Sequence, residues 1–488
     1  MIHMQIIALA ALLIVRDALD VPRPAEPLAG WRAAAAMLVP MGLIALITHL
    51  ICMRSRRRLD RTGDVAAVST ADVAVSLARW AALACFAAGV WGAGWLEAVR
   101  HAIGDLPGVD EAVATLPPIC VFMLGWWSKY PIERALHDAA LMGDLDHGVP
   151  VAPFPGRVGY VLEQTRFQVL AALIPLAMLT AWSELVDFAV RLSSDRLNWP
   201  SDEGSTALAE SIGQIAGVLG MTLLIPLLLA KLWGLVPLGA GAIRTRLEEL
   251  ARLQGVRFRD LLVWPTRTGM LNGALVGVFP GFRYIILTDG LLERLEPEHV
   301  EAVMAHEVAH ARKHHLPWLL ASALSAVGVT WIVAAAGLDA AMNALDPAWT
   351  QDHGTVALLD GAVLTAALAA GVLIFGFVNR RFEEQADAFA VQHLCGRTRA
   401  GEERRDIVIH AAGAEQMSGA LAEVARLNGI PERRFTFRHG SIAGRRRKIA
   451  ALVGRPAHEL PIDRKVAVIK AMAGIGLAVV LAAGVAGG

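Results

Sequence analysis

Two histidines four residues apart, with a glutamate directly after the first, stand in the middle of this 488-residue sequence. They are His306 and His310, in the pentapeptide HEVAH, and the glutamate is Glu307. On a helix, residues four apart lie one turn apart on the same face, so both imidazoles can reach one tetrahedral zinc ion. Glu307 then lies beside the open coordination position, where a carboxylate can take a proton from the water that the metal activates. This HExxH pattern indicates a hydrolytic metal site.

The pentapeptide alone leaves an alternative open. It should arise by chance in roughly one chain per hundred of this length, so two ordinary helix-surface histidines are a second interpretation. The residues that follow, 311–316, lack the glycine and third histidine of the extended metzincin motif. His314 and His315, at the membrane end of the helix, are interpreted as interface or electrostatic residues. A third ligand must therefore come from a distant part of the chain.

A second pair of residues four apart, Glu383 and Asp387, can complete the site. Glu383 can be the third metal ligand. Asp387 can accept the free ring N–H of a ligating histidine, which fixes the orientation and tautomer of that ring. Paired acids on a helix also occur on ordinary solvated faces, and Glu384 is interpreted in that way.

Composition predicts a lipid environment for these residues. The chain is 55% hydrophobic, with a mean hydropathy of +0.48, too apolar for an ordinary soluble enzyme. Lys and Arg number 45 and so do Asp and Glu, which leaves no broad basic field for a nucleic-acid partner. Cysteine spacing indicates neither a disulfide framework nor a cysteine metal site. The four cysteines are Cys52, Cys85, Cys120 and Cys395.

Seven apolar stretches are long enough to cross about 30 Å of hydrocarbon. They span residues 33–53, 75–96, 167–186, 212–236, 318–340, 356–378 and 466–485. Two weaker candidates are 1–15, which lacks the features of a signal peptide, and 113–127, in which two prolines occur. We therefore expect a mainly α, polytopic membrane protein with about seven to nine transmembrane helices, and the lipid bilayer as a partner.

Positive charge predicts the orientation. Five arginines in 54–61 place that loop in the cytoplasm. Both weaker candidates are counted as crossings, and counting helices forward then puts 242–315 and 379–465 on the same cytoplasmic side, so the HExxH histidines and Glu383 can meet. Arginine greatly outnumbers lysine, which favours a GC-rich bacterial genome and hence a bacterial inner membrane.

Local patterns predict the elements of the two polar stretches. An amphipathic helix over 243–254 ends at Gly255, and a strand pair over 271–278 and 284–288 encloses a turn. A helix from Pro297 runs through the histidines to about His315. Further helices are expected over 381–393, 414–428 and 445–453.

The order of these features resembles a known family. A strand phrase over 284–292, the HExxH helix, two membrane crossings and a helix reading EEQADAF are similar to the integral-membrane gluzincins, which include the CAAX prenyl endopeptidases and the HtpX-type heat-shock proteases. The resemblance covers roughly 243–452. It implies a gluzincin-like zinc peptidase domain with a small β-sheet, one zinc ion per chain, and a peptide or protein substrate.

Carried over residue by residue, the resemblance makes His306, His310 and Glu383 zinc ligands and Glu307 the general base and acid. Asp387 becomes the acceptor behind the ligands. Arg380 falls on the basic position that precedes the ligand helix.

The family's late His-Pro motif corresponds here to His439 and Gly440, with Arg445 following. The resemblance implies that His439 and Arg445 stabilise the oxyanion and anchor the ligand residues. Gly440 replaces the usual proline, so the family's loop geometry does not carry over directly. A solvated His439 with no role in the site is the alternative interpretation.

An edge strand to which an extended peptide adds itself is implied near Asn272 and Ala274. Here Gly273 is inserted between the two residues that match the family's Asn-Ala position. A simple turn is the alternative interpretation of this stretch.

The expected organisation has five segments. They are a multi-pass region over 1–240, a first catalytic part over 241–316, a membrane hairpin over 317–378, a second catalytic part over 379–465 and a last helix over 466–488. The expected function is hydrolysis of peptide bonds in membrane or membrane-associated proteins, for quality control or processing. CAAX-type processing of lipid-modified proteins is one alternative, and a catalytically inactive scaffold or transporter is another.

Overall fold

The computed structural model describes most of the chain as two compact units, Met1–Met221 and Thr222–Gly488. The described residues are 5–6, 9, 12–13, 30–64, 66–104, 108–146, 154–197, 203–266, 270–344, 353–396, 407–458 and 460–486. Helices dominate both units, and the expected mainly α fold is confirmed.

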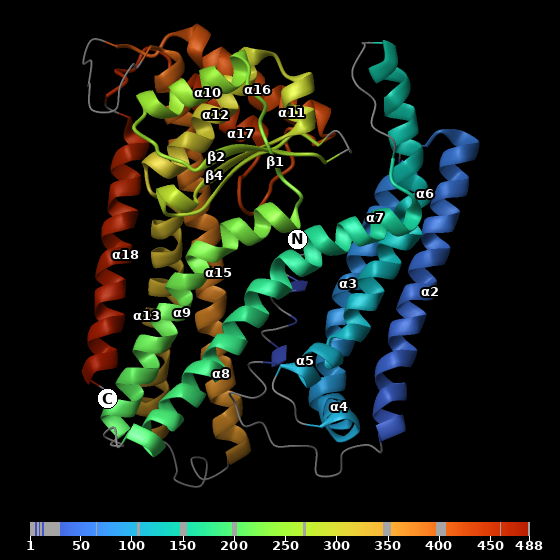
Figure 1. Ribbon diagram of the computed structural model, residues 1–488, viewed down its shortest axis with the longest axis vertical. Coiled ribbons are helices and arrows are strands. Elements are labelled where there is room, and N and C mark those ends of the chain that lie inside the picture. Colours follow the sequence, from blue (N-terminus) through green and yellow to red (C-terminus); the bar gives the residue numbers. More distant parts are fainter. Residues whose placement is uncertain are drawn as a thin grey trace. The chain divides into compact units, whose positions relative to one another are not determined.

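Within the described part of the first unit, all the regular elements are helices (Figure 1). They are α2 (Gly30–Thr62), α3 (Ala66–Gly92), α4 (Trp95–Ile103), α5 (Val109–Ala114), α6 (Leu116–Asp146), α7 (Arg157–Gln164), the π-helical η1 (Thr165–Leu170) and α8 (Ala171–Leu197). The next helix, α9 (Glu203–Leu232), runs on into the second unit. Helices α2, α3 and α6 pack against one another around Met37, Phe86 and Phe122, whose side chains are fully buried.

Seven helices among the described residues are long and apolar enough to cross a membrane. They coincide with the seven strong apolar stretches of the sequence, so the polytopic prediction is confirmed. Helix α6 is not among the seven. The two prolines of the apolar stretch, Pro117 and Pro118, lie in the first turn of α6, where they start a helix rather than interrupt one, and a third, Pro131, lies inside the helix. The candidate at 1–15 lies largely outside the described residues.

In the second unit, the described residues after α9 form a small sheet and eight α-helices. They are α10 (Ala242–Leu253), α11 (Asp289–Arg294), α12 (Pro297–Arg312), α13 (His315–Ala344), α15 (His353–Leu394), α16 (Ala411–Leu427), α17 (Ile442–Ala450) and α18 (Pro461–Ala486). The expected helices are confirmed, with one difference. The helix expected over 381–393 is not separate but is the end of the 42-residue α15, because no proline or glycine interrupts the chain after Gly376.

The sheet has four strands in the order β1-β2-β4-β3. They are β1 (Val236–Pro237), β2 (Asp260–Trp264), β3 (Gly273–Val276) and β4 (Tyr284–Thr288). The expected antiparallel pair is β3 and β4, whereas β2, which runs parallel to β4, was not expected. Among the described residues β3 pairs with β4 alone, so its other side is an open edge.

Helix α12 lies at the centre of the second unit. It contacts α10, α13, α15, α16 and β3. Its apolar face buries Val300, Met304 and Val308 almost completely, and each such side chain contributes about 1.5–3 kcal/mol to stability. Figure 1 shows α13, α15 and α18 running side by side beneath this part. The central position of α12 fixes the backbone that carries the two histidines.

Candidate metal centre

Packing of α12 against α15 brings three potential ligand groups together. Nε2 of His306 and Nε2 of His310 are 3.3 Å apart. The carboxylate of Glu383 places Oε2 3.5 Å from the first nitrogen and Oε1 3.7 Å from the second. All three ligand atoms lie within 4.8 Å of one another. Two imidazoles and one carboxylate are a donor set typical of catalytic zinc, so these residues fit that ion.

Asp387 and Arg445 lie behind this group. Oδ1 of Asp387 is 3.0 Å from Nδ1 of His306, on the far side of the ring from Glu383. Arg445 donates to Asp387 through Nε (2.8 Å) and Nη2 (2.6 Å), and its Nη1 is 3.3 Å from Oε2 of Glu383. Such a two-pronged contact holds a carboxylate in one orientation. The guanidinium of Arg445 thus contacts both Glu383 and Asp387.

Burial and the neighbouring charges shift the pKa values of His306 and His310 in opposite directions. Burial lowers the pKa of His306, but the carboxylates of Asp387 and Glu383 outweigh it and raise this pKa to about 10. Burial and the neighbouring His306 lower the pKa of His310 to about 4. Without a metal, the raised pKa favours the imidazolium form of His306, with a second proton on Nε2 toward Glu383. A metal ion has to displace that proton.

A tight loop brings His439 to the same place. Thr436 and Gly440 exchange backbone hydrogen bonds of 3.0 and 2.9 Å, and Gly440 has a φ of 74°. Proline cannot adopt this φ, so the loop differs from one built on His-Pro. Nδ1 of His439 nevertheless lies 3.1 Å from Oε2 of Glu383, with 47% of the side chain exposed.

Arg380 contacts the loop that carries His439. Its Nη1 donates to the carbonyl oxygen of Phe437 (2.8 Å), and Nδ2 of the neighbouring Asn379 donates to that of Arg438 (2.8 Å). Arg380 therefore supports the loop that carries His439 and acts on the three ligand groups only through that loop.

A cavity of about 490 Å³ opens onto the three groups and onto Glu307. Burial raises the pKa of Glu307, which makes it a stronger base than an exposed glutamate. Asn272 and Ala274 also line the cavity. Between them, Gly273 lies against Glu307: a Cβ there would be 3.4 Å from Cγ of Glu307 and 3.0 Å from Cγ1 of Val303. The inserted glycine is thus the residue that leaves room for Glu307.

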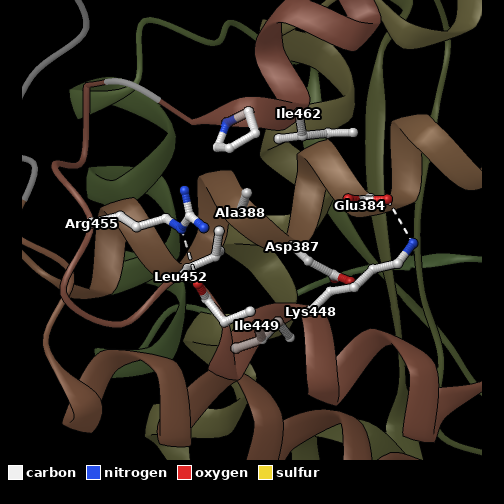
Figure 2. Close-up of a pocket in the computed structure, with 10 residues that line it drawn as sticks. Glu384, Asp387, Ala388, Lys448, Ile449, Leu452, Arg455 and Ile462 are labelled. Carbon is white, nitrogen blue, oxygen red and sulfur yellow. Dashed lines mark hydrogen bonds and ion pairs between the residues drawn. The ribbon is translucent and has the colours of Figure 1, made fainter.

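Glu384 is turned to the other side of α15, as the sequence suggested. It pairs with Lys448 (2.6 Å) and Arg381 (3.2 Å) at a separate hollow of about 150 Å³ (Figure 2). Asp387 forms part of the wall between this hollow and the metal centre.

His315 is a residue of this centre that sequence reasoning missed. It was expected at the membrane interface, yet it is only 2% exposed and its Nδ1 lies 2.9 Å from Nδ1 of His310. Its position five residues after His310 carries no helical signal, because α12 ends at Arg312 and α13 begins at His315.

Comparison with known proteins gives consistent matches to one family. Residues 237–445 match the model of Peptidase family M48. Over 181 residues the chain is 30% identical to a CAAX prenyl protease 1 homolog of Arabidopsis thaliana, covering 35% of this chain and 42% of that protein. Over 197 residues it is 26% identical to a Protease HtpX homolog of Aeropyrum pernix, covering 38% and 61% respectively. The chain thus spans less than two thirds of these relatives.

A solved structure is similar as well. The crystal structure of S. mikatae Ste24p aligns with a TM-score of 0.43 and 14% identity, covering 88% of this chain and 100% of that chain. The family resemblance expected from the sequence is confirmed for the segment 237–445, which contains the HExxH residues, Glu383 and Arg445.

Proposed function

We propose that this chain is a membrane-embedded zinc endopeptidase that cuts membrane or membrane-associated proteins. In this proposal His306, His310 and Glu383 bind one zinc ion per chain. The observation that carries it is the meeting of these three groups with Glu307 in one cavity, although the chain crosses the membrane twice between them. A site that only stored a metal would not need Glu307.

Each residue of the site has a separate role in the proposed reaction. Bound zinc would polarise the substrate carbonyl and lower the pKa of water. Glu307 takes the proton of the attacking water and passes it to the leaving amine. His439, half exposed at the cavity, stabilises the negative charge that develops on the carbonyl oxygen. Arg445, whose donors are engaged by two carboxylates, holds the ligand residues in place.

The substrate is proposed to bind as an additional strand. The open edge of β3 lies at the cavity, next to Glu307, and an extended peptide can pair with such an edge through its main chain. Asn272 already uses its N–H and carbonyl on Thr288, and residues of a strand alternate in direction, so main-chain pairing with the substrate starts at Gly273. Leu275, Met417 and Leu421 line the same cavity and favour an apolar side chain in the substrate.

Quality control of membrane proteins is the first candidate for the biological role. The second is the processing of lipid-modified proteins, favoured by the match to a relative named CAAX prenyl protease 1 homolog. We place the site on the cytoplasmic side of a bacterial inner membrane, because the arginines of 54–61 lie in the last turns of α2. This placement takes the 31-residue α6 as a further crossing, so that α3, α6, α8 and α9 separate the arginines from the site and return the chain to the same side. We also propose that the chain is organised in the five segments given above, with the two catalytic parts on the cytoplasmic side.

Substitution of Glu307 tests the activity. Glu307→Gln in the full chain, purified in detergent, should keep one zinc per chain and lose about 10²–10⁴-fold in the cleavage of an unfolded membrane protein. Glu384→Gln is the matched control, since it changes the same residue type on the far side of α15. Unchanged cleavage by Glu307→Gln contradicts the mechanism. Zinc binding without cleavage by the unsubstituted chain favours the scaffold.

A further inference from the structure

The last helix of the chain reaches the metal centre through a line of hydrogen bonds. Nδ1 of His310 and Nδ1 of His315 are 2.9 Å apart, and Nε2 of His315 is 2.9 Å from Oε1 of Gln385. Nε2 of Gln385 then donates to Oδ1 of Asp463, which lies in the first turn of α18. His315 and Gln385 are 2% and 4% exposed, so water does not replace these contacts.

The carboxylate of Asp463 determines which atom donates and which accepts in each of these hydrogen bonds. An ionised carboxylate only accepts, so Asp463 makes Gln385 point its NH₂ outward and its oxygen at His315. That oxygen requires the proton of His315 on Nε2, which leaves Nδ1 of His315 as an acceptor. Nδ1 of His310 must then carry the proton and donate. Nε2 of His310 is left with the lone pair that faces Glu383 and His306.

The position of His315 depends on two further features. Its ring stacks on that of Phe382, with centroids 4.5 Å apart and planes 7° apart. His314 has a φ of 53°, in the left-handed region that residues other than glycine seldom adopt. His314 follows the end of α12 and turns the chain so that α13 begins with His315 directed back at His310.

We propose that His315, Gln385 and Asp463 are positioning residues that fix the tautomer of His310, so that α18 is a working part of the metal centre. A ligand histidine held in the wrong tautomer presents N–H to the metal instead of a lone pair. The inference rests on the metal site of the proposed function but not on its peptidase activity. Zinc affinity is therefore the property to measure.

The first test replaces His315 in the full chain in detergent and measures zinc binding by competition with a chelator. His315→Leu should raise the zinc dissociation constant about 10–100-fold, the usual effect of losing such a partner. His315→Asn should recover most of the affinity, because an amide oxygen can take the place of Nδ1 as acceptor. A structural role alone would lower the unfolding temperature of the metal-free protein in both variants and leave the affinity unchanged.

The second test changes Asp463, the residue furthest from the metal centre in this line of hydrogen bonds, and again measures zinc binding. Asp463 also pairs with Lys313 at 3.4 Å. Asp463→Asn lets the Gln385 amide turn over and should weaken zinc binding about tenfold. Lys313→Met, the matched control, removes the ion pair but keeps the acceptor and should bind as the unsubstituted chain does.

The outcomes separate this inference from the proposed function. Unsubstituted affinity in both His315→Leu and Asp463→Asn overturns the inference. Equal loss in Asp463→Asn and Lys313→Met also overturns it, since the effect would then be that of an ion pair. A chain that binds zinc with the expected pattern but cleaves no protein supports the inference and contradicts only the peptidase.

Discussion

Gly273 offers a direct test of the space around Glu307. An alanine there would put its Cβ 3.4 Å from Cγ of Glu307, where carbon atoms prefer about 3.8 Å. Relief of that contact moves Glu307 by about 0.4 Å. Because a displacement of about 1 Å in a catalytic group costs about 100-fold, the shift corresponds to about 1 kcal/mol, or about sixfold in kcat.

Gly273→Val sharpens the test, since its added methyl groups reach about 1.5 Å beyond Cβ. Val303 blocks the other side, at 3.0 Å from the Cβ position, so Glu307 has to give way. We expect a loss of at least about 100-fold in kcat. Zinc content should stay the same, because Glu307 is not a ligand.

The assay is steady-state cleavage of a membrane protein substrate by purified variants, with zinc content and unfolding temperature measured beside it. Gly281→Ala is the matched control, because a Cβ at Gly281 meets nothing within 4 Å. Gly273→Val with kcat within twofold of the unsubstituted enzyme would refute the placement of Glu307 next to the edge strand.

Four further outcomes are expected. Arg445→Met removes the guanidinium from two buried carboxylates and should destabilise the metal-free chain by about 3–5 kcal/mol in chemical denaturation, whereas Arg446→Met should change little. The hydrogen bond from His393, opposed by burial and aided by Arg246, holds the pKa of Glu301 below its usual value. The stability that Glu301 contributes is thus complete above about pH 4.3 and is lost as the pH falls through the lowered pKa, a dependence that Glu301→Gln should flatten in denaturation curves. Chelation should abolish cleavage and zinc should restore it, with metal analysis giving one ion per chain. Gly277→Ala should lower the unfolding temperature, because φ is 103° and a Cβ would lie 2.4 Å from the carbonyl oxygen of Phe282.

Periodic features of the sequence made the fold predictable. Seven long apolar stretches became seven helices, and the spacing of His306 and His310 gave their common face. Glu383 followed from the need for a third ligand. Helical periodicity therefore gives the parts of the site that lie four residues apart on one helix.

Long-range contacts were not predictable in the same way. Strand β2 has a parallel partner more than twenty residues away and no local turn to mark it. His315 follows a break in the helix, and Gln385 and Asp463 meet only because α15 and α18 pack together. Arg445 contacts acids almost sixty residues earlier in the chain. No local rule of spacing connects such residues.

Helix α15 sets the distance between the ligand residue Glu383 and the apolar stretch of the same helix. Its 42 residues extend about 63 Å, of which a hydrocarbon layer needs only about 30 Å. Glu383 lies on the same unbroken rod as the apolar stretch, so the height of the ligand is fixed by helical rise and not by a hinge. For the proposed peptidase, this means that the target bond has to come to the level of Glu383 along the rod before it can be cleaved.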